Sequence, residues 1–221
     1  MKTAAHPFVF IGCVELRQAL DKQALDEREL LDRLEEVPPG SVFYHTHGYF
    51  LRHRPLTTAY GNDFARWAAV EVRDQALAER LAVVDPFEFR GLEELREELV
   101  TIVYDHLRRL SSVPRAEAGG AFHFQQSHIV TVELGPQATT LAEFRDGLAG
   151  VDASAIYFHM VEARARLGRR SGDFAEWLRT SLEMPALAER IERIDSYMTS
   201  LERVRARLLS LVDEALESEV V

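Results

Sequence analysis

The sequence predicts a predominantly helical α+β protein with a tandem internal duplication, each repeat being a short N-terminal strand followed by about five helices. Three observations support this fold class. Motifs recur in the same order in the two halves, each half opens on a Phe-x-Phe alternation, and apolar residues then recur at helical spacing. Two such repeats can pack about a pseudo-twofold axis.

The recurring motifs define the predicted domain organisation. The segments "SVFYHTH", "NDFARW" and "QALAERLAVVD" match the later segments "AIYFHMV", "GDFAEW" and "PALAERIERID". These matches align His45 with His159, Asp63 with Asp173, and Trp67 with Trp177. We predict repeat 1 at residues 1–110, a linker rich in Ser, Pro, Ala and Gly at 111–121, and repeat 2 at 122–221, packed as one compact body.

Each repeat is expected to begin with a half-buried strand. Phe8 and Phe10 in the first copy, like Phe122 and Phe124 in the second, alternate so that both rings lie on one face. The two strands are expected to pair with each other, because an isolated strand leaves its backbone groups without hydrogen bonds.

Helical signals follow each strand. The pairs Asp26/Glu29 and Thr140/Glu143 have the spacing of a capping box, which predicts a helix start in both copies. The aromatic-His motif is expected on a helix at about 40–53 and 154–167. Further helices are predicted from Asp63 and Asp173, over the two "ALAER" segments, and along the apolar stripes that begin at Leu92 and Leu201.

Composition narrows the function classes. The chain has 221 residues, is 47% hydrophobic and 28% charged, and carries a formal net charge of -10. This charge argues against a general role on nucleic acid or anionic membranes, both of which need basic surface. The single cysteine, Cys13, excludes an internal disulfide and a zinc site with two cysteines. With no apolar stretch near the ~20 residues of a membrane helix, we expect a cytoplasmic protein.

The motifs also carry a resemblance. "FYHTH", "NDFARW", "FHMVEARARLG", "GDFAEWL" and "ALAERIERID" together resemble a bacterial two-repeat family catalogued only as a domain of unknown function. The resemblance covers nearly the whole chain. It implies no particular reaction, and it is as compatible with a binding or accessory role as with an enzyme.

The histidines are the first candidate site. His45 and His159 are shared by both halves, whereas His47 is present in the first alone. His159 and Glu162 are three residues apart and share a helix face, so His45, His159 and Glu162 could converge on a divalent metal ion if the halves pack together. The alternative, which we favour, is that the histidines are buried and hydrogen-bonded. No catalytic residue is assigned.

Aromatic and basic residues form the second candidate site. The rings of Trp67 and Trp177 could stack on a sugar, although a helix cap followed by core aromatics explains the same pattern. Arginines before the Asp63 and Asp173 helices could bind an anion near free helix N–H groups, or could simply complement the dipole of the preceding helix. These arginines are Arg52, Arg54, Arg169 and Arg170.

The sequence thus favours a non-enzymatic binding, regulatory or accessory protein that self-associates or binds a protein partner, without nucleic acid or membrane. One alternative is a metal-dependent or acid/base enzyme with a His/Glu site between the repeats. Another is a module that binds a carbohydrate, a phosphosugar or another anion. Signatures of nucleotide-binding loops, zinc proteases and serine hydrolases do not occur in the sequence.

Overall fold

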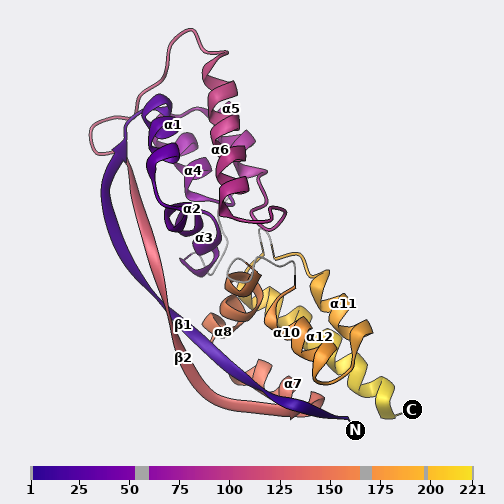
Figure 1. The fold of residues 1–221 in the computed structure, drawn as a ribbon. Coiled ribbons are helices and arrows are strands. Elements are labelled where there is room, and N and C mark those ends of the chain that lie inside the picture. The colour runs from indigo at the N-terminus through magenta and orange to yellow at the C-terminus, as the bar shows by residue number, and fades with distance from the viewer. Residues whose placement is uncertain (1, 53–59, 165–170, 197–198, 221) are drawn as a thin grey trace. The chain divides into compact units, whose positions relative to one another are not determined.

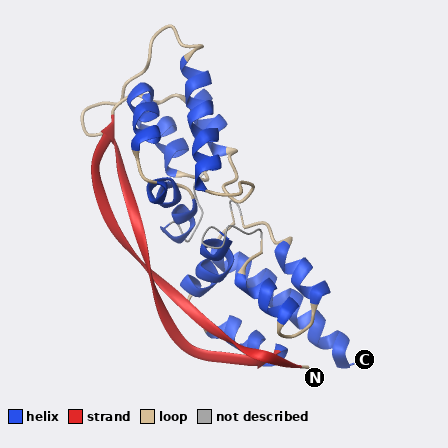
Figure 2. Cartoon of the chain, in the orientation of Figure 1, coloured by secondary structure: helices blue, strands red, loops and turns tan. Residues whose placement is uncertain are grey.

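The computed structural model describes residues 2–52, 60–164, 171–196 and 199–220 (Figure 1). The chain is a predominantly helical α+β protein whose two strands form one two-stranded sheet (Figure 2). Among the described helices, none combines the length and the apolar character needed to cross a bilayer.

The elements fall into two runs, each led by a strand. The first run is β1 (Thr3–Ala24), α1 (Glu27–Glu36), α2 (Pro39–His45), α3 (His47–Arg52), α4 (Asp63–Trp67), the π-helix η1 (Ala68–Val72), α5 (Gln75–Ala82) and α6 (Leu92–Leu107). The second run is β2 (Phe122–Thr140), α7 (Leu141–Gly150), α8 (Ala153–Tyr157), the π-helix η2 (Phe158–Glu162), α10 (Asp173–Thr180), α11 (Pro185–Glu192) and α12 (Leu201–Val220).

The predicted repeat unit, a short N-terminal strand followed by about five helices, is wrong. The strands are 22 and 19 residues long, and one of them begins in the middle of the chain. They extend past the Phe-x-Phe alternation because strand pairing uses backbone groups and needs no buried side chain. Val14, Leu16, Val130 and Val132 are accordingly exposed. The helix predicted at 40–53 is divided at Thr46 into α2 and α3. The pseudo-twofold arrangement was predicted for repeats of this kind, so that prediction is withdrawn together with the repeat unit.

The two strands run in opposite directions. The side chains of Gln18 and Gln126 are joined by a 2.7 Å hydrogen bond, and Gly12 lies beside Leu134. Residue numbers therefore fall along β2 as they rise along β1, and β1 and β2 run side by side in Figure 1. The predicted pairing of the strands with each other is confirmed.

Contacts divide the chain into two compact units. Unit 1 consists mainly of Met1–Val14 and Ile129–Val221, and unit 2 consists mainly of Glu15–His53 and Thr57–His128. The start of β1 thus belongs with the later helices, and the start of β2 with the earlier ones. The helices of each unit therefore pack with the start of the strand that comes from the other half of the sequence.

In unit 2, the first residues of β2 pack among the earlier helices. The Phe122 ring centroid lies 4.7 Å from that of His45 and 5.1 Å from that of Phe64. Trp67 packs edge-on against Phe122 and donates its indole N–H to the Gly120 carbonyl at 2.8 Å. Buried apolar residues of α1, α5 and α6 complete this core.

In unit 1, the first residues of β1 make the matching contacts. The Phe8 ring centroid lies 4.8 Å from that of His159 and 5.3 Å from that of Phe174. Trp177 packs edge-on against Phe8 and donates its indole N–H to the His6 carbonyl at 2.8 Å. The aligned aromatic residues therefore serve the same packing role in both units.

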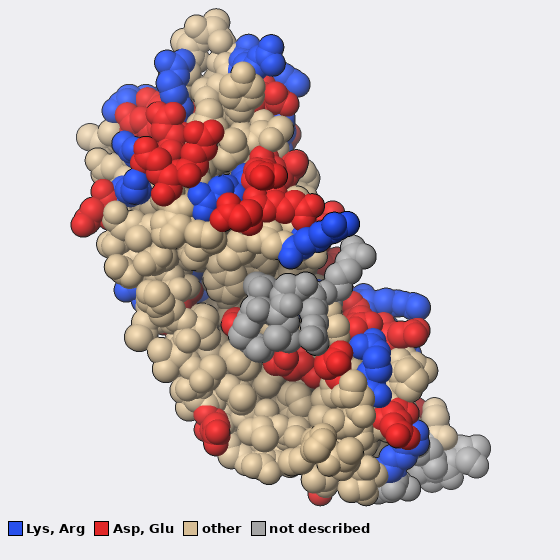
Figure 3. Space-filling view, in the orientation of Figure 1, with Lys and Arg blue, Asp and Glu red and all other residues tan. Residues whose placement is uncertain are grey.

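Surface charge is mixed in sign. The face drawn in Figure 3 carries acidic side chains next to basic ones. Lys22 and Arg33, for example, both pair with Glu36. Such exposed pairs add little stability, because water screens them.

We expect Gly147→Ala in α7 to lower the free energy of unfolding by about 1–3 kcal/mol, because overpacking a core strains it. An added Cβ would lie 2.2 Å from the Cε2 atom of Phe10, so the strand would have to shift. Urea denaturation measures the change. Gly150→Ala is the control on the same helix, since its Cβ would meet nothing within 4 Å. Equal stability of the two variants would contradict the packing described for β1.

Candidate functional site

His45 joins two helices of unit 2 to a strand. It is the last residue of α2, and its Nδ1 atom lies 2.9 Å from Oδ2 of Asp63, the first residue of α4. On the opposite side of the ring, the backbone N–H of Gln125 in β2 donates to Nε2 at 3.1 Å. The side chain is 4% exposed.

His159 is bonded in the same way in unit 1. Its Nδ1 atom lies 2.9 Å from Oδ2 of Asp173, the first residue of α10. The backbone N–H of Ile11 in β1 donates to its Nε2 atom at 3.0 Å. The two aligned His-Asp pairs therefore make equivalent contacts, each within its own unit.

This geometry determines the tautomer. A backbone N–H can only donate, so Nε2 of His45 must be the acceptor, and the ring proton sits on Nδ1 and is donated to Asp63. Burial lowers the pKa of His45, although Asp63 acts in the opposite direction, and this favours the neutral ring. With both nitrogens bonded, His45 and His159 have no lone pair directed at a metal or a substrate. The contacts support the packed, hydrogen-bonded interpretation.

The other residues of the predicted metal group lie as follows. Glu162 and His159 lie on the same π-helix of unit 1, and Glu162 is buried. His45 lies in unit 2. Convergence of the three on one metal stays a prediction, and it would require the strand N–H bonds to His45 and His159 to be broken. His47 is buried between Phe43, stacked at 5.1 Å, and Phe87, edge-on at 5.3 Å, measured between ring centroids. Burial lowers the pKa of His47 to about 4, so it is a neutral core residue at pH 7.

Trp67 and Trp177 are placed for packing. They are 4% and 7% exposed, and each indole N–H is bonded to a backbone carbonyl, that of Gly120 just before β2 or that of His6 in β1. Neither ring therefore offers an open face of the kind that stacks on a sugar. Trp67 is among the residues that line a pocket of unit 2.

Arg52 is held in place by unit 2. It donates to the Tyr44 carbonyl at 2.8 Å and to Asp63 at 2.5 Å, and its guanidinium carbon lies 3.8 Å from the Tyr44 ring centroid. The other arginines predicted to bind an anion lie outside the described residues; they are Arg54, Arg169 and Arg170.

A pocket of about 490 Å³ opens beside His45 and Arg52. Three guanidinium groups, from Arg17, Arg52 and Arg66, border it, against the carboxylates of Asp63 and Glu71. The predicted linker contributes the backbone of Gly119 and Gly120. Sequence reasoning identified Arg52 but missed Arg17, which lies in the part of β1 where no strand was predicted.

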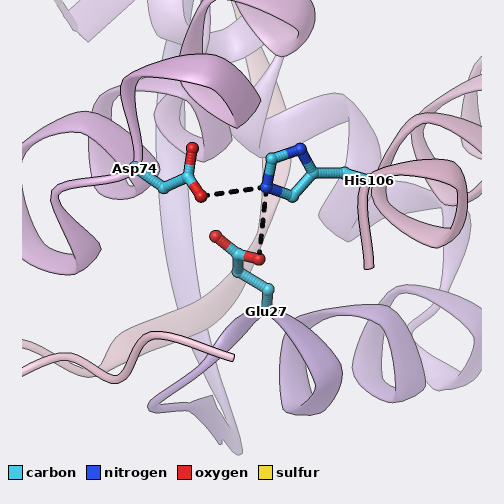
Figure 4. A group of neighbouring side chains, drawn as sticks. All are labelled: Glu27, Asp74 and His106. Carbon is cyan, nitrogen blue, oxygen red and sulfur yellow. Dashed lines mark hydrogen bonds and ion pairs between the residues drawn. The ribbon is translucent and has the colours of Figure 1, made fainter. Parts of the chain in front are cut away.

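A buried polar cluster was also missed. Glu27 at the start of α1, Asp74 at the N-cap of α5 and His106 in the last turn of α6 converge in unit 2 (Figure 4). Each offers one ligand atom, and the three atoms lie within 4.8 Å of one another. The sequence did contain a signal for this cluster. The positions of the second half that align with Glu27, Asp74 and His106 hold apolar residues, so three polar residues occur in the first half alone. The aligned residues are Leu141, Met184 and Ala215.

The cluster has an unusual protonation. Burial, together with the nearby Asp74 and Asp26 carboxylates, raises the pKa of Glu27 to about 8. Burial also works against ionisation of Asp74, but the Leu77 N–H and His106 hold the pKa of Asp74 below its ordinary value. In the absence of another cation, Glu27 therefore carries a proton at pH 7 that it can donate to Asp74.

We expect His159→Ala and His45→Ala each to lower the free energy of unfolding by about 2–4 kcal/mol, because each leaves a strand N–H and a carboxylate without their ring partner. Urea denaturation is the measurement. His6→Ala is the control, since His6 is exposed and bonds to Trp177 through its backbone. Unchanged stability of the first two variants would contradict the structural role.

We expect chelator-treated protein to lose stability as pH rises from 4.5 to about 8, relative to Glu27→Gln. Over that interval the folded state keeps a proton on Glu27 that the unfolded state releases. The stabilisation that this proton gives the folded state is therefore complete below pH 4.5. Above that pH it falls by at most about 1.4 kcal/mol per pH unit. Urea denaturation across this range checks it. Parallel curves for the two proteins would show that Glu27 has an ordinary pKa.

Comparison with known proteins gives a fold relative without a stated activity. The structure of OrfY from Thermoproteus tenax is similar to this chain, with a TM-score of 0.81 and 29% identity over 96% of this chain and 97% of that one. No curated protein matches. A family model described as a family of unknown function, DUF5752, matches residues 5–213. The chain therefore belongs to the DUF5752 family, whose function is unknown.

Proposed function

We propose that the protein is a non-enzymatic binding or accessory protein, and that the pocket of unit 2 takes a small anionic ligand such as a phosphorylated sugar. The observation that carries this proposal is the meeting of Arg17, Arg52 and Arg66 around one pocket of about 490 Å³. Small-molecule pockets commonly have volumes of about 300–1,000 Å³. Guanidinium groups suit phosphate because they form paired, charge-assisted hydrogen bonds.

The three arginines have different roles in this proposal. Arg52 is fixed by Asp63 and Tyr44, so its position requires little further ordering when a ligand binds. Arg17 and Arg66 are exposed and can turn towards an anion. The lining has three guanidinium groups and two carboxylates, and the buried Glu15 carboxylate lies 3.4 Å from Arg17 and 3.6 Å from Arg52. An anion would therefore bind by replacing Glu15 as a partner of the exposed Arg17 and by pairing with Arg66.

Polar groups of the lining suit a hydroxylated ligand. The Tyr44 hydroxyl donates to the Gln125 side chain at 2.8 Å, which leaves the Gln125 amide group able to donate. His45 borders the same pocket, but its bonded nitrogens supply neither a base nor an acid, which favours binding over reaction. The pocket of unit 1 differs, since its described lining includes the carboxylates of Glu162 and Asp173.

The proposal also covers the origin, the location and the partners of the protein. We infer a bacterial, cytoplasmic protein that self-associates or binds a protein partner. Support for a partner comes from apolar side chains exposed along the two strands, namely Val14, Leu16, Val130 and Val132. Light scattering of the purified protein measures its oligomeric state.

We expect inorganic phosphate and hexose phosphates to bind in isothermal titration calorimetry, and Arg66→Ala to weaken binding about tenfold or more, since a hydrogen bond to a charged group contributes about 1.5–3 kcal/mol. Arg17→Ala should act in the same direction. Arg193→Ala is the control, because this exposed arginine lies in unit 1, where it is the C-cap residue that follows α11.

Three results would contradict the proposal. The first is the absence of heat with every phosphate compound at millimolar concentration. The second is an equal loss of affinity in the Arg193→Ala control, which would indicate nonspecific attraction to charge. The third is an uncharged hexose that binds as tightly as its phosphate, which would exclude an anion site and favour a neutral carbohydrate.

A further inference from the structure

The buried carboxylate of Glu27 is the feature of unit 2 that neither packing nor the arginine pocket explains. Glu27 is 0% exposed, and neither of its side-chain oxygens has a hydrogen-bond donor among the described residues. The carboxyl group points towards Asp74 and His106 (Figure 4). An ionised carboxylate buried without partners is strongly unfavourable, so the site needs either the proton on Glu27 described above or a cation in its place.

The three side chains have the spacing of metal ligands. The Nε2 atom of His106 lies 2.9 Å from Oδ2 of Asp74 and 3.7 Å from Oε2 of Glu27. For bonds of about 2.0–2.2 Å to one ion, tetrahedral geometry separates neighbouring ligand atoms by roughly 3.3–3.6 Å. Small side-chain adjustments would bring all three atoms to that separation.

The fold does not require these polar residues. Glu27 is the first residue of α1, and the aligned first residue of α7 is Leu141, which is buried. Asp74 is the N-cap of α5, and Met184 occupies the N-cap of α11. Equivalent helices are therefore built with apolar residues at these places, and the polar set is confined to unit 2.

We propose that Glu27, Asp74 and His106 bind a divalent transition-metal ion such as Zn²⁺ or Mn²⁺. Two carboxylates balance the two positive charges of the ion, so that the buried site becomes neutral. Imidazole nitrogen together with carboxylate oxygen is a ligand set used for zinc, manganese and iron.

Neighbouring groups hold the ligands in position. The Leu77 N–H donates to Oδ1 of Asp74 at 2.9 Å, which leaves Oδ2 directed at His106. Hydrogen bonds of this kind orient metal ligands in known sites. The Asp74 side chain is 13% exposed, and this side of the cluster gives an ion a route of entry.

Metal analysis of full-length, untagged protein tests the proposal. We expect about one equivalent of metal by inductively coupled plasma mass spectrometry. After removal of metal with EDTA, ZnCl₂ or MnCl₂ should raise the melting temperature by about 5–10 °C at a hundredfold excess over Kd, whereas MgCl₂ should have a smaller effect.

Variants distinguish this site from other metal-binding groups. Glu27→Gln and His106→Gln should each abolish the metal-dependent rise in melting temperature. Asp32→Asn, which changes an exposed carboxylate on the same helix, should retain it. The triple variant Glu27→Leu/Asp74→Met/His106→Ala carries the aligned residues of the second half, and circular dichroism should show that it folds without binding metal.

Either of two results would overturn the metal site. The first is protein that is purified without metal and whose melting temperature does not respond to added Zn²⁺ or Mn²⁺. The second is a metal-dependent rise that persists in the Glu27→Gln and His106→Gln variants. Phosphate binding in the arginine pocket is measured separately, so either proposal can fail without the other.

Discussion

The hydrogen bond from a strand N–H to the Nε2 atom of a buried histidine is the interaction on which each unit depends. It joins β2 to His45 in unit 2 and β1 to His159 in unit 1. The same ring donates from Nδ1 to the first residue of a helix, Asp63 or Asp173. One side chain thus fixes a strand and two helices, and a buried polar ring of this kind is stable only when both nitrogens are bonded.

Aromatic packing follows from that arrangement. The histidine positions the strand so that Phe122 or Phe8 inserts between the aromatic residues of the neighbouring helices. The indole N–H of Trp67 or Trp177 then donates to a backbone carbonyl, that of Gly120 just before β2 or that of His6 in β1. Because every retained residue of the "DFxxW" motif is used in these contacts, recurrence in both halves indicates a structural role.

Residues confined to one unit carry the candidate chemistry. Arg17, Arg52 and Arg66 surround a pocket of unit 2, and Glu27 forms a buried cluster with Asp74 and His106 in the same unit. The aligned positions of that cluster hold apolar residues, so the shared fold does not demand its charge. The comparison of aligned halves therefore separates what the fold needs from what a ligand would need.

The sequence by itself determined the local structure, because capping, helical periodicity and strand alternation depend on residues close together in the chain. Asp26 and Thr140 cap helices as predicted, and the "DFxxW" segments form helices that begin at Asp63 and Asp173. The buried state of His45 and His159 was also the favoured expectation. Only the tertiary structure decided which strand segment meets which helices, since paired strands extend through backbone hydrogen bonds that leave little side-chain pattern. The contact between Glu27 and His106 also depends on the tertiary structure, because the two residues are far apart in the chain and no local spacing relates them.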